Sequence, residues 1–295
     1  MKITMLSEID YAGSGHKLCQ AIRSFTKHDI EIYSGTYYNP FGHSDHSRWN
    51  KEDVQNRIDE SDIVHLKGDW PPRNRYLGLN ILHKPIVITV GGSHFRKARY
   101  GGYGKYDLQE YGQAAVRTAF TPDLCYEDFI WTPHPIDSWD KKIVSHKEDV
   151  PILMHIPTRR DIKGTDFVFD IFGGLKDLMD VKTLVIEDMP FRRVVEERKR
   201  ATIYFDQFKV GFYGNSAIEA MAYGIPVAAW IRPDLNINGC PVITEDRDAD
   251  KWVEKIFNIL NGSLDAEKAQ AKVWCDSIHS YESVAKQWNE IYASI

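Results

Sequence analysis

A short glycine-containing turn near residue 210 leads into a sequence typical of a helix start. The turn contains Gly211 and Gly214, and the helix carries Ser216 and Glu219. Glycine lets the backbone approach a ligand closely, and free N–H groups at a helix N-terminus attract anions. A nucleotide diphosphate suits such a place, and Glu219 is able to accept hydrogen bonds from ribose hydroxyls. The alternative is a capping box, in which Ser216 and Glu219 only satisfy N–H groups of their own helix.

A second set of candidates lies in the turn after the expected strand 152–156. Arg159, Arg160 and Lys163 fall there, and Gly164 follows them. Two cations in one strand-to-helix loop are able to clamp a diphosphate and to stabilise the charge that builds on it as it leaves. We assign this role to Arg160 and Lys163 before Arg159. The alternative is a solvated basic turn that precedes a helix.

Two loops of the N-terminal half offer further candidates. Gly13, Ser14 and Gly15 follow the expected strand 3–6, and His94 lies in the glycine-rich stretch after the expected strand 86–90. A glycine-rich loop at the end of a parallel strand is a common place for a phosphate to bind. His94 is either a functional group that acts near the reacting atoms or a surface residue.

The stretch from Glu219 to Val227 resembles the nucleotide-sugar site of retaining GT-B glycosyltransferases. That family has Glu, seven residues, Glu, and then Ala-Met-Ala-x-Gly-x-Pro-Val, and Glu219-Ala-Met-Ala-Tyr-Gly-Ile-Pro-Val matches the second half. The resemblance implies that Glu219 contacts the donor ribose. The first Glu of the pattern falls at Gly211, so the usual carboxylate contact to the donor sugar is missing from this sequence.

The resemblance extends to the basic turn and to the N-terminal loops, and it assigns residues to two roles. The donor nucleotide is assigned to Gly13, Ser14, Gly15, Arg160, Lys163, Tyr213, Gly214, Asn215, Ser216 and Glu219. The reaction is assigned to His94, Arg160 and Lys163.

These residues must be positioned by alternating strands and helices. Short apolar runs alternate with helical faces in both halves, which predicts an α/β fold of two Rossmann-like doubly wound domains that face each other across a cleft. The first helix is expected to bury Leu18, Ala21, Ile22 and Phe25. We expect an N-terminal acceptor domain over 1–137, a linker over 138–150, a nucleotide-sugar domain over 151–279, and a final helix over 280–295 that crosses back to the N-terminal domain.

Composition narrows the class of protein. The chain has 295 residues, a formal net charge of −5 and four widely spaced cysteines, which favours a reducing, cytoplasmic setting over a disulfide-linked one. We find neither a signal peptide nor a transmembrane segment in the sequence. His43 and His46 lie too close together in a loop to indicate a metal site, and the acidic residues 246–250 fit a helix N-terminus. Arg192, Arg193, Arg198, Lys199 and Arg200 are expected on a solvated helix face.

Together these features predict an enzyme that transfers a sugar from a nucleotide-sugar donor to an acceptor, without a metal or other cofactor. The resemblance implies retention of configuration. A glycan, a lipid carrier, a small molecule and, less favoured because of the net acidity, a hydroxymethylated DNA base all remain open as acceptors. The rival functions are a nucleotide-sugar epimerase on the same fold and a non-catalytic module that binds a nucleotide sugar.

Overall fold

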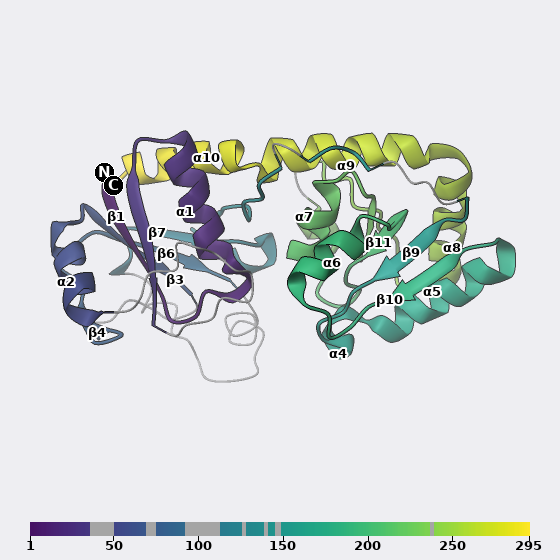
Figure 1. Ribbon diagram of the computed structural model, residues 1–295, viewed down its shortest axis with the longest axis horizontal. Coiled ribbons are helices and arrows are strands. Elements are labelled where there is room, and N and C mark those ends of the chain that lie inside the picture. Colours follow the sequence, from purple (N-terminus) through teal and green to yellow (C-terminus); the bar gives the residue numbers. More distant parts are fainter. Residues whose placement is uncertain are drawn as a thin grey trace. The chain divides into compact units, whose positions relative to one another are not determined.

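The computed structural model divides into two compact units (Figure 1). Unit 1 comprises Met1–Asp137 together with Ser280–Ile295, and unit 2 comprises Ser138–His279. The structure describes residues 1–35, 50–68, 75–91, 113–125, 128–138, 141–144, 149–236 and 239–295. His94, the histidines at 43 and 46, and most of the glycine-rich stretch after residue 91 lie outside the described residues.

Unit 1 is built on a parallel sheet with the strand order β2-β1-β3-β6-β7-β8. Its strands are β1 (Lys2–Ser7), β2 (Asp29–Ser34), β3 (Ile63–Lys67), β6 (Ile86–Val90), β7 (Val116–Ala119) and β8 (Ile130–Trp131). A small antiparallel hairpin joins β4 (Arg75–Tyr76) to β5 (Leu79–Asn80). The helices are α1 (Ser14–Phe25), α2 (Lys51–Glu60) and α10 (Tyr281–Ala293).

Helix α1 buries the face that its sequence spacing predicts, with one exception. Leu18, Ala21 and Ile22 are fully buried. Leu18 and Ile22 belong to one apolar cluster with side chains of β1 and β2. Phe25, the last residue of the helix, is exposed. The expectation that Phe25 belongs to the core is therefore wrong, because the helix ends where that side chain leaves the sheet.

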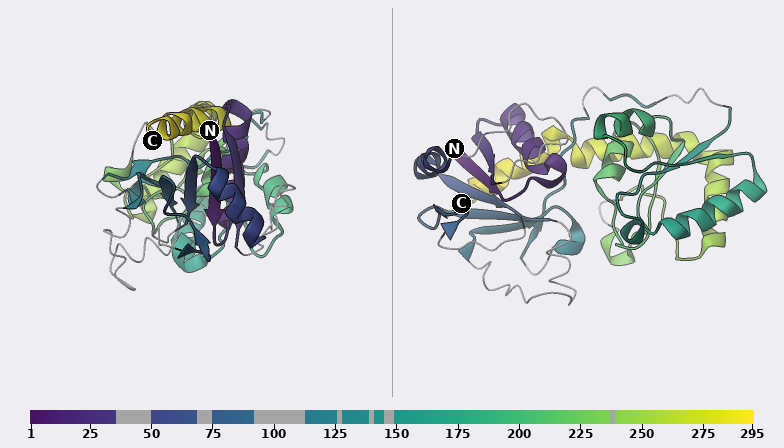
Figure 2. Two further views of the ribbon diagram at one scale, coloured as in Figure 1. Left: turned by 90° about the vertical axis from the view of Figure 1, so that its left-hand side faces the viewer. Right: turned by 60° about the horizontal axis from the view of Figure 1, so that its bottom comes forward.

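The C-terminal helix α10 packs against α1 inside unit 1, and both views in Figure 2 show the two helices side by side. A chain of buried hydrogen bonds links this helix to the sheet: His65 on β3 bonds the Tyr292 hydroxyl through Nδ1 and the Thr89 hydroxyl through Nε2, each at 2.7 Å. Thr89 in turn bonds Thr118 at 2.7 Å. Burial, with the nearby Lys67 ammonium, lowers the pKa of His65 to about 3, so the imidazole is neutral at physiological pH.

Unit 2 repeats the parallel plan with the strand order β10-β9-β11-β12. Its strands are β9 (Ile152–His155), β10 (Lys182–Val185), β11 (Ile203–Phe205) and β12 (Val227–Ala228). Its helices are α4 (Arg160–Lys163), α5 (Thr165–Leu178), α6 (Phe191–Arg198), α7 (Asn215–Met221), α8 (Ala249–Asn258) and α9 (Leu264–His279), and a π-helical turn (Ile259–Ser263) lies between α8 and α9.

The core of unit 2 forms between α5, α8 and the sheet. One face of α5 is buried, with Val168 and Leu175 packed in one cluster with Trp252 of α8. His155, the last residue of β9, bonds the Phe205 carbonyl at 2.8 Å through Nδ1 and the Thr165 hydroxyl at 2.9 Å through Nε2. This buried imidazole ties β9 to β11 and to the start of α5, so the carboxyl ends of these strands hold a fixed geometry.

The α/β prediction of two Rossmann-like domains is confirmed, and the differences are local. Strand β12 ends at Ala228, because the N–H groups of Ala229 and Trp230 bond the Ile243 and Gln207 carbonyls instead of a neighbouring strand. The short strands β7 and β8 and the β4–β5 hairpin were not predicted, because each presents too few apolar residues to stand out from a loop.

Candidate functional site

The carboxyl edge of the unit 2 sheet holds a buried ion pair. Asp206 follows β11, its side chain is 0% exposed, and it pairs with the ammonium of Lys163 at the end of α4. The second oxygen of Asp206 accepts a 2.5 Å hydrogen bond from the Gly214 N–H. Lys163 is 12% exposed, so the aspartate fixes the ammonium while part of it faces solvent.

Gly214 stands where this pair leaves no room for a side chain. A Cβ added there would lie 3.2 Å from an Asp206 oxygen and 3.3 Å from the Lys163 ammonium. Helix α7 begins at the next residue, with Gly214 as its N-cap and no side-chain cap hydrogen bond. Ser216 is thus the second helical residue, and the capping box that Ser216 and Glu219 were considered to form is absent.

Glu219 on α7 is held by a buried arginine. Arg198 Nη1 at the end of α6 donates a 2.7 Å hydrogen bond to Glu219 Oε2, and the two side chains are 3% and 13% exposed. The Arg198 guanidinium also lies 5.5 Å from the centre of the Tyr204 ring. The expectation that Arg198 belongs to a solvated helix face is wrong. Arg198 lies four residues after the buried Val194, and this spacing places both side chains on the buried face of α6.

Arg160 and Lys163, the two cations assigned to the diphosphate, pair with different carboxylates. Arg160 forms a two-pronged ion pair with Glu187, with a shortest distance of 2.5 Å, and its side chain is 55% exposed. Lys163, one turn later on the same short helix, pairs with Asp206. Arg159 pairs with Asp161 on the surface. The structure therefore fixes Lys163 at the edge of the sheet and leaves Arg160 in an exposed pair beyond β10.

Tyr213, assigned to the donor nucleotide, lies with its side chain in the core of unit 2. Its hydroxyl bonds His279 Nε2 at 3.0 Å, and its ring packs against Trp274. Burial raises the pKa of this hydroxyl well above its usual value. The side chain therefore has a packing role, and the neighbouring Asn215 and Ser216 are only partly buried at the start of α7.

Gly211 shows why the first glutamate of the resembling pattern has no counterpart here. Its φ is +86°, a region that favours glycine, and a Cβ would lie 2.7 Å from Arg232 Cγ and 3.1 Å from Trp230 Cζ3. The space above residue 211 is filled by these two side chains. A carboxylate at this position would require both to move and the backbone to change.

The carboxyl edge of unit 1 carries a similar but fully enclosed cluster that the sequence did not reveal. Asp10 after β1 pairs with Lys67 at 2.7 Å, bonds His16 Nδ1 at 2.8 Å and accepts the N–H groups of Gly15 and His16. Burial pushes the pKa of Asp10 upward, but Lys67 and the hydrogen bonds outweigh it and hold the pKa well below its usual range.

This cluster occupies the loop that was assigned to donor phosphates. A Cβ on Gly15 would lie 2.4 Å from Ile32 Cδ1, Gly13 has a φ of +60°, and the Ser14 hydroxyl donates to the Tyr11 carbonyl at 3.1 Å. The glycines thus serve tight packing, and the Asp10 carboxylate takes N–H groups that a phosphate would need.

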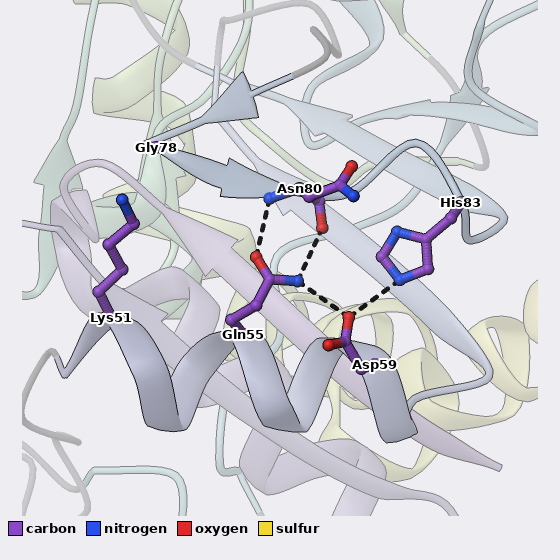
Figure 3. A pocket seen from close by; sticks show the side chains of 6 residues that line it. All are labelled: Lys51, Gln55, Asp59, Gly78, Asn80 and His83. Carbon is purple, nitrogen blue, oxygen red and sulfur yellow. Dashed lines mark hydrogen bonds and ion pairs between the residues drawn. The ribbon is translucent and has the colours of Figure 1, made fainter.

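A groove of about 600 Å³ runs along α2 in unit 1 (Figure 3). Gln55 on α2 binds the β4–β5 hairpin through two hydrogen bonds: its side-chain amide donates to the Asn80 carbonyl at 3.1 Å and accepts from the Asn80 N–H at 2.8 Å. Asp59 accepts from Gln55 at 2.9 Å and pairs with His83 at 3.0 Å. The groove is lined by Lys51, Gln55, Asp59, Gly78, Asn80 and His83.

The described residues contain no group of three or more His, Cys, Asp or Glu side chains placed to hold a metal ion. No helix among them is long and apolar enough to cross a membrane.

Comparison with solved structures identifies the fold. An α-glucosyltransferase, solved with UDP and a 13-mer DNA that contains an HMU base, is 12% identical with a TM-score of 0.68, and the match covers 99% of both chains. Sucrose-phosphate synthase from Thermosynechococcus elongatus is 11% identical with a TM-score of 0.65, over 100% of this chain and 98% of that one. At such identities the likeness establishes the GT-B type of fold.

The same fold also occurs in an epimerase. UDP-GlcNAc 2-epimerase from Neisseria meningitidis, bound to UDP-GlcNAc, is 10% identical with a TM-score of 0.59 over 100% of both chains. No protein-family model and no curated protein sequence matches the chain.

Proposed function

We propose that the chain is a glycosyltransferase that moves a sugar from a nucleotide-sugar donor to an acceptor, with the donor bound by unit 2. The observation that carries this proposal is the Lys163–Asp206 pair at the carboxyl edge of the parallel sheet, where open α/β sheets bind their ligands. Glu219 with Arg198 adds a partly exposed carboxylate on the adjoining helix.

Each group has a distinct part in the proposed reaction. Lys163, with its charge partly exposed, binds the donor diphosphate and stabilises the negative charge that develops when the bond from the sugar to the phosphate breaks. Glu219 accepts hydrogen bonds from the ribose hydroxyls. Arg160 leaves Glu187 to contact the diphosphate from the exposed side. We propose that these cations supply the neutralisation without a metal ion, and that the sugar retains its configuration, as the sequence resemblance implies.

The acceptor is proposed to bind to unit 1. Support comes from the resemblance alone, because His94 and the neighbouring loops lie outside the described residues. The α-glucosyltransferase solved with HMU-containing DNA makes such DNA a member of the acceptor panel, beside glycans, lipid carriers and small molecules.

The test is calorimetric titration of the protein with UDP-glucose, UDP-galactose and UDP-GlcNAc, followed by an assay for slow donor hydrolysis without acceptor. We expect at least one donor to bind and Glu219→Ala to weaken it at least about tenfold, since a lost charged hydrogen bond typically costs that much. Absence of binding by all three, or unchanged binding by the variant, would overturn the proposal.

The second candidate function is epimerisation, which the likeness to UDP-GlcNAc 2-epimerase favours. Conversion of UDP-GlcNAc to its 2-epimer without any acceptor, followed by chromatography or NMR, would replace the transferase proposal. Tight donor binding with neither conversion nor hydrolysis nor transfer would instead indicate a binding module.

A further inference from the structure

Arg198 is a buried cation that pairs with a carboxylate of the neighbouring helix α7. Its side chain is 3% exposed, and among the described residues Glu219 is the one carboxylate within ion-pair distance. Its Nε is buried and has no hydrogen-bond partner within the described part of the chain. A buried guanidinium is stable only beside a negative charge, so this position requires Glu219 to stay ionised.

The geometry places the arginine behind the carboxylate. Arg198 comes from the end of α6 and contacts one oxygen of Glu219 from the interior, over the ring of Tyr204 on β11. Glu219 is more exposed than Arg198, at 13% against 3%. The Glu219 side chain therefore reaches solvent in part, while one oxygen of its carboxylate is fixed by Arg198.

The same arginine balances the charge of the donor-binding edge. Two carboxylates, Asp206 and Glu219, lie near the Tyr204 hydroxyl, and burial together with Asp206 raises the pKa of that hydroxyl, whereas Arg198 acts in the opposite direction. A diphosphate adds further negative charge to this edge. The charge of Lys163 offsets that of Asp206, and the charge of Arg198 offsets that of Glu219. The Glu219 carboxylate that receives the ribose therefore exerts no net repulsion on the phosphates.

We propose that Arg198 is a positioning residue for donor binding, which keeps Glu219 ionised, oriented and electrically balanced; this inference rests on the proposed function of unit 2. It acts through Glu219 and does not itself touch the donor. Loss of Arg198 leaves a carboxylate without its counter-charge beside the phosphates, which weakens nucleotide binding through Glu219 alone.

The experiment is a double-mutant cycle on the affinity for UDP, measured by calorimetry at pH 7.5. Arg198→Met is expected to weaken UDP about 10- to 100-fold, the usual loss when a group that orients a ligand-binding side chain is removed. Glu219→Gln is expected to weaken UDP about tenfold. The double variant is expected to bind no more weakly than Glu219→Gln, because Arg198 has no effect without the carboxylate.

Arg193→Met is the matched control, since it makes the same chemical change on an exposed position of α6 and should leave the UDP affinity unchanged. If Arg198→Met does not fold, the cycle is run with Arg198→Lys, which keeps the charge and is expected to weaken UDP by less than about tenfold, with no further loss when it is combined with Glu219→Gln.

The outcomes separate the two proposals. A folded Arg198→Met protein that binds UDP as the wild type does, or losses that multiply in the double variant, overturn the positioning role and leave the transferase proposal intact. A wild-type protein that binds neither UDP nor any of the three donors overturns both.

Discussion

The carboxyl edge of each sheet carries an aspartate that pairs with a lysine and accepts backbone N–H groups, but the two pairs differ in how far they are exposed to solvent. In unit 1, Asp10 pairs with Lys67 and accepts the N–H groups of Gly15 and His16, and every member is buried. In unit 2, Asp206 pairs with Lys163 and accepts the Gly214 N–H, but the ammonium remains partly exposed.

We propose that this difference separates a structural cluster in unit 1 from an anion-binding site in unit 2. In unit 1 the Asp10 carboxylate is engaged by Lys67, by the His16 imidazole and by two backbone N–H groups inside the protein, so its role is to fix the loop before α1. A cation that is oriented by an aspartate but reaches solvent is prepared for an anion. Variants of the two edges should therefore affect different properties.

The largest effect is expected for Asp10→Asn. Removing the carboxylate charge leaves the buried Lys67 ammonium uncompensated, which should lower the free energy of unfolding by about 3–5 kcal/mol. Urea unfolding monitored by circular dichroism measures this loss. Asp29→Asn is the control: it neutralises the exposed Asp29 carboxylate on β2, whose partner Arg57 on α2 keeps its second carboxylate, Glu31, and it should have little effect. Equal losses in the two variants would mean that the unit 1 cluster is no more structural than a surface ion pair.

The next effect concerns ligand affinity at the unit 2 edge. Lys163→Met should reduce the affinity of the folded protein for UDP about 10- to 100-fold, because it removes the ammonium that meets the diphosphate. Calorimetry measures the affinity, and Lys176→Met, an exposed lysine in the last turn of α5, is the control. Undiminished UDP binding by Lys163→Met would remove the contrast between the two edges.

The sequence predicted the elements that form these edges but not the ion pairs on them. The strand–turn–helix units were predictable because apolar runs and glycine turns are local patterns, and the resemblance of the stretch from Glu219 to Val227 directed attention to the end of β11. The ion pairs were not predictable, because Asp10–Lys67 and Arg198–Glu219 join side chains from different elements that only packing brings together.

Packing explains two features that the sequence did not predict. Gly13 and Gly15 were interpreted as donor-binding; in the structure Gly13 has a φ of +60°, and Gly15 donates its N–H to Asp10 and lies against Ile32. Arg198 was read as solvated because its neighbours are charged, but its spacing from Val194 places it inward. Charge alone does not indicate exposure when a carboxylate from another helix is within reach.

A third prediction concerns the pH dependence of unit 1. His65 has a folded-state pKa of about 3, below the usual unfolded value of about 6.5, so the unfolded chain binds the proton more readily. The stabilising contribution is fully present above pH 6.5 and is lost as the pH falls toward 3. Between pH 7.5 and 5.0 the loss should be about 2 kcal/mol.

Urea unfolding at both pH values measures this loss, with His65→Gln as the comparison. The variant is expected to be less stable at pH 7.5, because it disturbs the bonds to Tyr292 and Thr89, but to lose less on acidification. Equal pH dependence in both proteins would show that other groups account for it.

The smallest effect is expected for Arg160→Gln, which tests the exposed side of the unit 2 edge. Its pair with Glu187 is largely solvated, so the unfolding midpoint should not change. If Arg160 moves from Glu187 to the diphosphate when the donor binds, UDP affinity should fall about threefold, and the fall should shrink in high salt because an exposed charge is screened. Glu187→Gln should act in the opposite direction, since it releases the same guanidinium. An unchanged affinity in both variants would confine the donor-binding charge to Lys163, the cation that Asp206 already holds in place.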